Sequence, residues 1–355
     1  MSRTLLRFVA TSWIAMLAFI TPGRCDPADE YKISEPVAHE NLTVYLVHAK
    51  TSGGPVPMTL QEALEKKKVR VIETGNVNQL AVENLADEDV FIQAGDIVKG
   101  GQQDRALTVS LILPPHSGQI PIAAFCVEAG RWTARGAEDS RTFSVADQTV
   151  PSREAKVMMS SPAKTAPRAD PIGGSAGLTA EPSGQQAMWN EARRIQQSLS
   201  KNLKTTAEDP TSPTSLRLTL DNEKLQRAQN AYITALQPAG EREDDIVGYV
   251  FTINGRVNSA AVYSSNGLFR KMWPKLLRAG AVEAIDAGTD AQTAAAKPAA
   301  IDDVRNFLKS AETGQVTERK LTPSVTQQTR DRAESLFVET KRSEGPWVAR
   351  SYLAK

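Results

Sequence analysis

The sequence has few cysteines and few histidines, and its charges nearly cancel. Its 355 residues include 2 Cys and 3 His, with 42 Lys and Arg against 41 Asp and Glu. Two cysteines cannot form a disulfide framework or a four-cysteine zinc site, and three widely spaced histidines argue against a metal centre built from histidine. A formal net charge of +1 leaves no electrostatic signal for nucleic acid. We therefore expect no metal, no cofactor and no nucleic-acid partner.

The chain also lacks a comfortable membrane span near its start. The apolar run Phe8 to Ile20 is shorter than the roughly 20 residues that a transmembrane helix needs. Arg3 and Arg7 precede this run and Gly23-Arg24-Cys25 follows it, which is the layout of a secretory signal peptide. We expect cleavage before Asp26 and a periplasmic or secreted mature protein without a stable membrane span. A lipid anchor on the cysteine at the cleavage site is the alternative.

Cleavage would change the charge and the thiol count. It removes three arginines and no acidic residue, so the mature chain carries 39 basic and 41 acidic side chains and a net charge of −2. Cys126 becomes the single cysteine, which excludes an internal disulfide even in an oxidising compartment.

The first half of the mature chain, residues 26–150, is predicted to be β-rich. From Asn41 to about Thr142, apolar and polar residues alternate between turn signals, as in an antiparallel meander. Thr59-Leu60-Gln61-Glu62 is a capping box that predicts one short helix, ending near Lys67. The strands are expected at Val69–Glu73, Gln79–Glu83, Asp89–Gln93, Arg105–Leu113 and Gln119–Glu128.

Residues 151–187 are rich in proline, alanine and serine, and bury too little apolar surface to offset their ordering entropy. They predict a flexible insertion. Residues 188–355 then predict an α+β second half of the same domain, with a hairpin at Ile246–Ile253 and Arg256–Tyr263 joined by Asn254-Gly255. Helices are expected at 187–203, 222–236, 265–285 and 301–310, and further strands near 316–321, 335–339 and 347–352.

Two features of the second half are interruptions. Pro274 is expected to kink or split the helix at 265–285, because proline removes a helical hydrogen bond and crowds the preceding turn. Ala287–Ala300 predicts a low-complexity spacer. The fold class is α+β: an antiparallel sheet or sandwich formed by the first half, with helices and a β-hairpin from the second half packed on it.

Two motif matches lack what their chemistry requires. Gly173 to Gly177 fits G-x-S-x-G, but it lies in the predicted insertion rather than at a strand-to-helix turn. Gly95 to Gly100 has the glycine spacing of a P-loop, yet Gly101-Gln102 follows where Lys and Ser or Thr are needed. These matches support neither a serine hydrolase nor a P-loop nucleotide site.

One group of chemically capable residues remains, on either side of a predicted hairpin. Folding the chain at Pro114–Gly118 and pairing apolar positions places Leu107 opposite Cys126 and Arg105 opposite Glu128. This register brings charged, amide and indole side chains together beside a Gly-Gly turn. The predicted ligand-binding residues are Gly100, Gly101, Gln103, Asp104, Arg105, Glu128, Arg131 and Trp132.

The chemistry of these residue types suits an anion with a ring. Either arginine can bind a phosphate or carboxylate in bidentate fashion, the indole can stack on a base, and the glycines can let a ligand approach the backbone. Asp104 and Glu128 are candidates for an acid/base pair. The plainer interpretation is that Arg105 and Glu128 form a structural ion pair and that Cys126 is a buried, inert thiol.

Several segments give the chain a resemblance to a known family. They are Gly95-Asp96, Lys99 to Arg105, Cys126 to Trp132, Val247 to Tyr249, Ile253 to Gly255, Ser265 to Phe269, Trp273 and Lys275-Leu276. On these segments the chain resembles the ARG-and-rhodanese-phosphatase-superfamily-associated protein domain over about Asn41 to Lys355. That resemblance implies a link by genomic association to ADP-ribosyl glycohydrolases and rhodanese-like phosphatases, and so to NAD-derived or ADP-ribose-type molecules. It supplies no catalytic residues.

The leading hypothesis is an exported, non-catalytic binding or accessory protein for an anionic nucleotide-like or ADP-ribose-type ligand. One alternative is a hydrolase that uses Asp104 and Glu128 on an ADP-ribose-like or glycosidic substrate. The other is a structural envelope protein, which would bind no small molecule.

Overall fold

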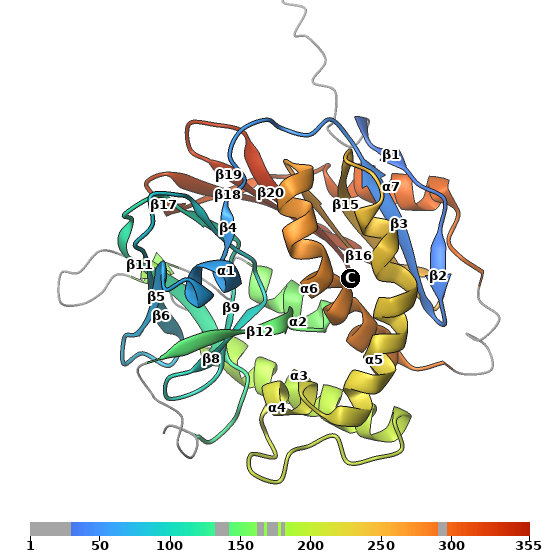
Figure 1. Ribbon diagram of the computed structural model, residues 1–355, viewed down its shortest axis with the longest axis horizontal. Coiled ribbons are helices and arrows are strands. Elements are labelled where there is room, and N and C mark those ends of the chain that lie inside the picture. Colours follow the sequence, from blue (N-terminus) through green and yellow to red (C-terminus); the bar gives the residue numbers. More distant parts are fainter. Residues whose placement is uncertain (1–29, 132–141, 162–166, 169–176, 179–181, 290–296) are drawn as a thin grey trace, which may run out of the picture.

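The computed structural model describes residues 30–131, 142–161, 167–168, 177–178, 182–289 and 297–355 (Figure 1). Antiparallel sheets and helices make up these residues, which confirms the α+β class. The expected signal peptide, Trp132 and residues 162–166, 169–176 and 179–181 of the expected flexible insertion lie outside the described residues. Within the described part, no helix is both long enough and apolar enough to cross a membrane.

The largest sheet has nine strands and combines the two ends of the described chain. Its order is β1-β3-β15-β16-β20-β19-β18-β17, with β2 also paired to β3. The hairpin β15–β16 lies near the middle of this sheet, so the expectation that it packs on a first-half sheet is wrong. The bounds are β1 Lys32–Ile33, β2 Val37–His39, β3 Leu42–His48, β15 Ile246–Ile253, β16 Arg256–Tyr263, β17 Thr317–Thr322, β18 Val325–Asp331, β19 Ser335–Arg342 and β20 Trp347–Ala354.

The turn of the central hairpin follows from its sequence. Asn254 has φ 52° and Gly255 has φ 74°, the left-handed conformations that a tight two-residue hairpin turn requires. The sequence prediction of this hairpin is confirmed at both strands and at the turn.

The first half supplies two smaller sheets. A six-stranded sheet has the order β12-β8-β9-β11-β6-β5, and a three-stranded sheet has the order β10-β7-β4. The described residues also contain a short two-stranded pairing of β13 with β14. The bounds are β4 Met58–Thr59, β5 Val69–Glu73, β6 Gln79–Asn84, β7 Val90–Ile92, β8 Asp96–Gly100, β9 Arg105–Leu107, β10 Leu111–Leu113, β11 Gly118–Cys126, β12 Phe143–Thr149, β13 Pro167–Arg168 and β14 Gly177–Leu178.

The expected strand Arg105–Leu113 is broken, and its predicted register is wrong. Only β9 pairs with β11, while β10 joins β7 in the other sheet and the start of β11 pairs with β6. Leu107 lies opposite Ala124 and Arg105 lies opposite Cys126. The pairing is therefore shifted by two residues, which keeps each side chain on its predicted face but separates Arg105 from Glu128.

The helices pack between and around the sheets. In α1 the predicted capping box is present, with Thr59 accepting from the Glu62 amide and Glu62 accepting from the Thr59 amide. The longest described helix, α6, runs unbroken through Pro274, so it is not split. The bounds are α1 Leu60–Glu65, α2 Arg153–Ser160, α3 Pro182–Asn202, α4 Leu216–Leu220, α5 Glu223–Leu236, the 3₁₀ helix η3 Gln237–Glu241, α6 Asn266–Ala287 and α7 Ile301–Ala311.

Two helices correct the limits of the expected flexible insertion at residues 151–187. Helix α2 occupies Arg153–Ser160, and α3 begins at Pro182. The Ser152 hydroxyl caps α2 by accepting from the Ala155 amide, and Ala155 and Met159 bury one side of the helix. A capped amphipathic helix can form in a proline-flanked segment once a core is available to bury its apolar face.

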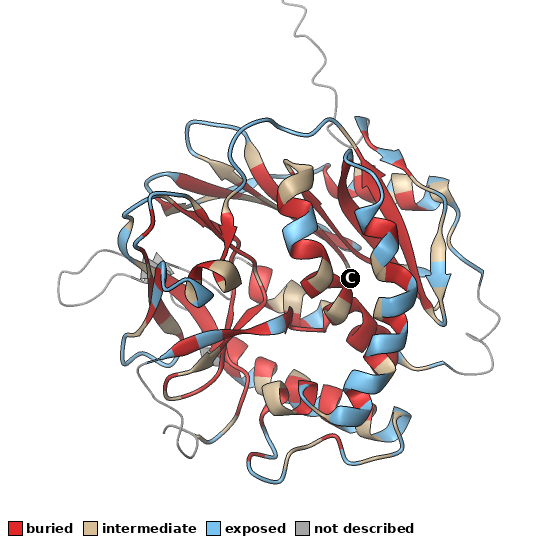
Figure 2. Cartoon of the chain, in the orientation of Figure 1, coloured by how far each residue is buried: buried red, intermediate tan, exposed pale blue. Residues whose placement is uncertain are grey.

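Helix α6 links the sheets through the core. It packs on β15 of the nine-stranded sheet and on β12 of the six-stranded sheet, and its Trp273 is fully buried against Tyr249 and Phe251. Buried apolar side chains from both halves of the chain form one continuous cluster. Figure 2 colours the buried residues of the chain red. A second cluster lies on the opposite face of the large sheet, where it includes Val304 and Leu308 of α7.

Candidate functional site

The residues singled out by the sequence lie in two connections of the six-stranded sheet. Gln103 and Asp104 lie between β8 and β9, and Glu128 and Arg131 lie just after β11. The structure brings Asp104, Glu128 and Arg131 together, but it turns Arg105 towards a different partner.

Arg105 is fully buried and bound by groups of the protein itself. Its Nε donates to the Val77 carbonyl at 3.0 Å, Nη1 to the Gln103 carbonyl at 2.9 Å, and Nη2 to Glu73 Oε2 at 3.4 Å. The predicted pair of Arg105 with Glu128 is replaced by a pair with Glu73, because the register shift places Cys126 opposite Arg105.

Asp104 and Glu128 are each held by an arginine. Asp104 Oδ2 accepts from Arg217 Nε at 3.3 Å. Asp104 Oδ1 accepts from the Gly100 amide at 3.2 Å and lies 4.0 Å from Arg131 Nη2. Glu128 accepts from Arg131 Nε at 2.8 Å and from the hydroxyl of Ser212. The side chains of Asp104 and Glu128 are 1% and 0% exposed, so neither carboxylate is open to a substrate in this conformation.

The two glycines are explained by packing. Gly101 has φ +63°, and a Cβ on it would overlap with Glu73 and the Phe143 ring. A Cβ on Gly100 would overlap with the Thr142 carbonyl. Glycine is required there because protein atoms occupy the space, which removes the need for a ligand close to the backbone.

Cys126 is buried, as predicted. Its amide donates to Gln185 Oε1 at 2.8 Å, and its thiol contacts the Val77 carbonyl at 3.6 Å. Burial raises the pKa of the thiol from 9.0 to about 11, so the reactive thiolate is scarce at neutral pH.

We expect the native mature protein to be inert to a thiol reagent such as DTNB at pH 8. Only after unfolding should its single thiol react and release one equivalent of thionitrobenzoate. Because the pKa of the folded thiol is raised, the unfolded state ionises first and stability falls as pH rises from about 9 to 11. Rapid labelling of the native protein in an absorbance assay would contradict the buried position.

The charges in this region offset one another. Among the described residues of this region, three arginines face three carboxylates, so the charges of these six side chains cancel. Trp132, the predicted stacking residue, lies outside the described residues. The ion-paired side chains are Arg105, Arg131 and Arg217 with Glu73, Asp104 and Glu128.

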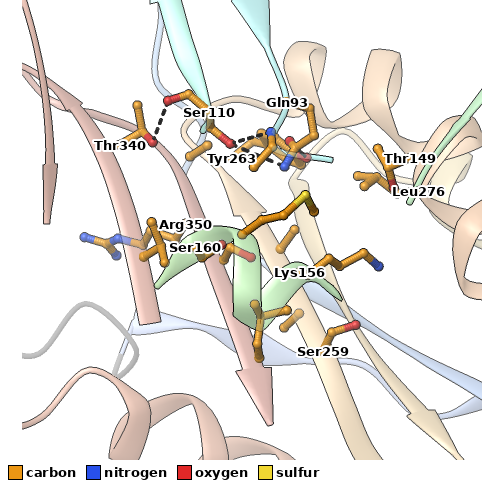
Figure 3. A pocket seen from close by; sticks show the side chains of 18 of the residues that line it. Gln93, Ser110, Thr149, Lys156, Ser160, Ser259, Tyr263, Leu276, Thr340 and Arg350 are labelled. Carbon is orange, nitrogen blue, oxygen red and sulfur yellow. Dashed lines mark hydrogen bonds between the residues drawn. The ribbon is translucent and has the colours of Figure 1, made fainter. Parts of the chain in front are cut away.

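A different site lies between the sheets. A cavity of about 40 Å³ is lined from the nine-stranded sheet, from β12, from the ends of β7 and β10, and from α2 (Figure 3). This volume gives room for about three water molecules, or for a small group such as a phosphate or a carboxylate. Its polar lining includes Gln93, Ser110, Thr149, Lys156, Ser160, Ser259, Tyr263, Gln327 and Thr340.

One side of the cavity is internally satisfied. Tyr263 donates to Gln93 Oε1 at 2.7 Å, Gln93 Nε2 donates to the Ser110 hydroxyl at 3.4 Å, and Thr340 donates to the Ser110 carbonyl at 3.3 Å, as the dashed lines in Figure 3 show. Burial raises the pKa of Tyr263 well above its ordinary value, so its hydroxyl stays protonated and remains a donor. The side chains on this side of the cavity are therefore held by hydrogen bonds to one another.

Two hydroxyls that line the cavity have no partner among the described residues. They belong to Thr149, which is 0% exposed, and Ser259, which is 3% exposed. Both lie at irregularities of strand pairing: the β12–β8 register shifts between Val145 and Thr149, and the β15–β16 register shifts beside Asn258. Bulges of this kind re-aim side chains and are common at functional sites.

Lys156 of α2 provides a cation at the cavity. Its side chain is 17% exposed, and its nearest carboxylate oxygen among the described residues is Glu283 Oε2 at 3.7 Å, too far for a hydrogen bond. Glu283 Oε1 instead accepts from the Arg153 amide at 2.7 Å and from Asn258 Nδ2 at 3.0 Å. By contrast, the buried Lys275 lies 2.9 Å from Asp96 and is fully engaged.

A separate, open groove of about 550 Å³ lies on the other side of an ion pair from the cavity. Glu283 lines the groove and Lys156 lines the cavity, so this pair stands between the two spaces. The groove is bordered by α2, α3, the end of α6 and the β15–β16 turn.

Sequence reasoning missed Lys156, Thr149 and Ser259. Lys156 fell inside the segment interpreted as flexible, although Ser152 followed by Glu154 and an apolar pair is a helix-start signal. The other two residues depend on bulges, which the alternation pattern does not report.

These features define an α+β protein in which antiparallel sheets meet across α6 and enclose a polar cavity. The family described as the ARG and Rhodanese-Phosphatase-superfamily-associated Protein domain matches residues 30–353, and the chain belongs to this family. Neither the curated proteins nor the solved structures include a significant match.

Proposed function

We propose that this is an exported, non-catalytic protein that binds a small anionic molecule, with the anionic group in the cavity and the rest of the ligand in the groove. The observation that carries the proposal is the set of buried hydroxyls of Thr149 and Ser259, which lack partners among the described residues and line the same cavity as Lys156. The export part rests on the signal-peptide pattern of the sequence.

The donors of the cavity match an oxyanion. An ammonium group and two hydroxyls can all donate to phosphate or carboxylate oxygens, and buried hydroxyls without partners carry a free-energy cost that such a ligand removes. Lys156 Nζ lies 3.7 Å from Glu283 Oε2, too far for a hydrogen bond, so its N–H groups can donate to an oxyanion. A nucleotide-like molecule would place one phosphate there, since the cavity itself cannot hold a nucleoside.

The binding proposal fits better than acid/base catalysis by Asp104 and Glu128. Both carboxylates are enclosed, and each is paired with an arginine. A general acid or base must lie within hydrogen-bond reach of the substrate.

We expect phosphate-bearing compounds to stabilise the mature protein in a thermal-shift screen against inorganic phosphate, nucleotides, ADP-ribose and neutral sugars at constant ionic strength. A ligand at 100 times its Kd should add about 2.7 kcal/mol to the free energy of unfolding. Stabilisation by neutral sugars alone, or by none of the compounds, would contradict the proposal, and turnover of a bound compound would overturn its non-catalytic part.

A further inference from the structure

A histidine and two carboxylates far apart in sequence meet at one end of the nine-stranded sheet. His48 ends β3, while Glu243 and Asp245 lie just before β15, its neighbour in the sheet. One ligand atom from each of the three lies within 4.8 Å of the others. None of the three lines the cavity or the groove of the proposed ligand site.

The spacing of these atoms suits a small divalent cation. His48 Nδ1 lies 2.8 Å from Asp245 Oδ1 and 3.9 Å from Glu243 Oε2. Zinc bonds of about 2.0–2.2 Å in tetrahedral geometry place neighbouring ligand atoms about 3.4 Å apart, between these two distances. The side chains of Glu243 and Asp245 are 64% and 59% exposed, so both carboxylates have room to rotate towards this spacing.

The protein holds the loop before β15 in place from α6. Asn266 Nδ2 donates to the carbonyls of Glu243 and Ile246 at 3.2 and 2.8 Å, and Arg270 binds the Asp244 carboxylate at 2.8 Å. Asp244 therefore points towards Arg270, while Glu243 and Asp245 on either side of it lie near His48. The His48 ring is 8% exposed, so the imidazole is fixed and the carboxylates form the outer side of the site.

We propose that His48, Glu243 and Asp245 form a zinc site with three protein ligands and an open position. One imidazole and two carboxylates are a donor set that zinc accepts, whereas calcium and magnesium prefer more oxygen ligands. Lys32 lies opposite His48 on β1 and is exposed, so the side chain on this neighbouring strand leaves the histidine to the two carboxylates. The sequence argued against a metal centre because its histidines are widely spaced, but the sheet supplies the ligands from two distant segments.

The test is calorimetric titration of the metal-free mature protein with Zn²⁺. We compare Glu243→Gln and Asp245→Asn, which preserve size at exposed positions, with the control Glu334→Gln, which changes an exposed acidic residue outside this loop. Losing even an outer-shell partner of a metal ligand weakens affinity by about 10–100-fold, so each ligand variant should lose about 10-fold or more. The control should bind zinc with the affinity of the wild type.

A His48→Ala variant should lose binding as well, and its circular dichroism melt shows whether its fold is intact. Because the two carboxylate variants alter exposed side chains, the test does not depend on His48→Ala folding. Absence of zinc binding by the wild-type protein, or equal affinity in all variants, would overturn the site.

Discussion

Arg105→Ala is expected to lower the free energy of unfolding by about 3–5 kcal/mol, the usual cost of removing one partner of a buried ion pair. The change empties the space of a large, fully buried side chain, and it removes the guanidinium donors to the carbonyls of Val77 and Gln103. It also leaves Glu73, whose side chain is 18% exposed, without its arginine. Urea denaturation followed by circular dichroism measures the loss.

Arg70→Ala is the matched control. Arg70 lies on the neighbouring part of the same sheet and pairs with Glu83 at 2.7 Å, but its side chain is 60% exposed. Exposed pairs contribute about 0–1 kcal/mol, so this variant should unfold close to the wild-type midpoint. If both variants lose the same small amount, Arg105 is not part of the structural support described above.

Local signals were sufficient for much of the fold. The capping box of α1 and the Asn254-Gly255 turn each depend on a few adjacent residues, and both were predicted correctly. The amphipathic helices α3, α5 and α7 were also found, since a repeating apolar face is a property of the segment itself. Strand β18 was missed, because its sequence Val-Thr-Gln-Gln-Thr-Arg-Asp carries little apolar alternation.

Long-range pairing was the main source of error. The predicted hairpin register assumed that Arg105–Leu113 stays beside one partner strand, but the chain changes sheets between β9 and β10. Strand β10 pairs with β7, and the first part of β11 pairs with β6, in place of the simple hairpin. The alternation of apolar residues within the hairpin does not reveal these partner strands. Because of this error, Arg105 was expected beside Glu128, whereas in the structure it pairs with Glu73. Asp104, Glu128 and Arg131, which were predicted to bind a ligand, form internal ion pairs in the structure.

The proposed ligand and metal sites depend on the same kind of distant contact. Thr149, Lys156 and Ser259 meet only when β12, α2 and β16 are assembled, and His48 meets Asp245 across 197 positions of sequence. Composition described the segment around Lys156 correctly as proline-flanked and polar. It could not show that a core elsewhere in the chain orders that segment as α2.

Lys156→Met should weaken binding of inorganic phosphate, or of the tightest phosphate-bearing ligand from the screen, by about 10–100-fold. That range corresponds to a charge-assisted hydrogen bond of about 1.5–3 kcal/mol. Methionine keeps an unbranched apolar stem of similar length, so the packing of α2 is retained. Glu283 keeps its bonds to the Arg153 amide and Asn258.

The most direct test is isothermal titration of that ligand into Lys156→Met and Arg131→Met side by side, with the fold of each checked by circular dichroism. The two side chains are buried to a similar extent: Arg131 is 13% exposed and Lys156 is 17% exposed. We predict that Lys156→Met loses affinity while Arg131→Met binds like the wild type. Loss of affinity in Arg131→Met with full binding in Lys156→Met would show that the ligand site lies at the ion-paired cluster instead of the cavity.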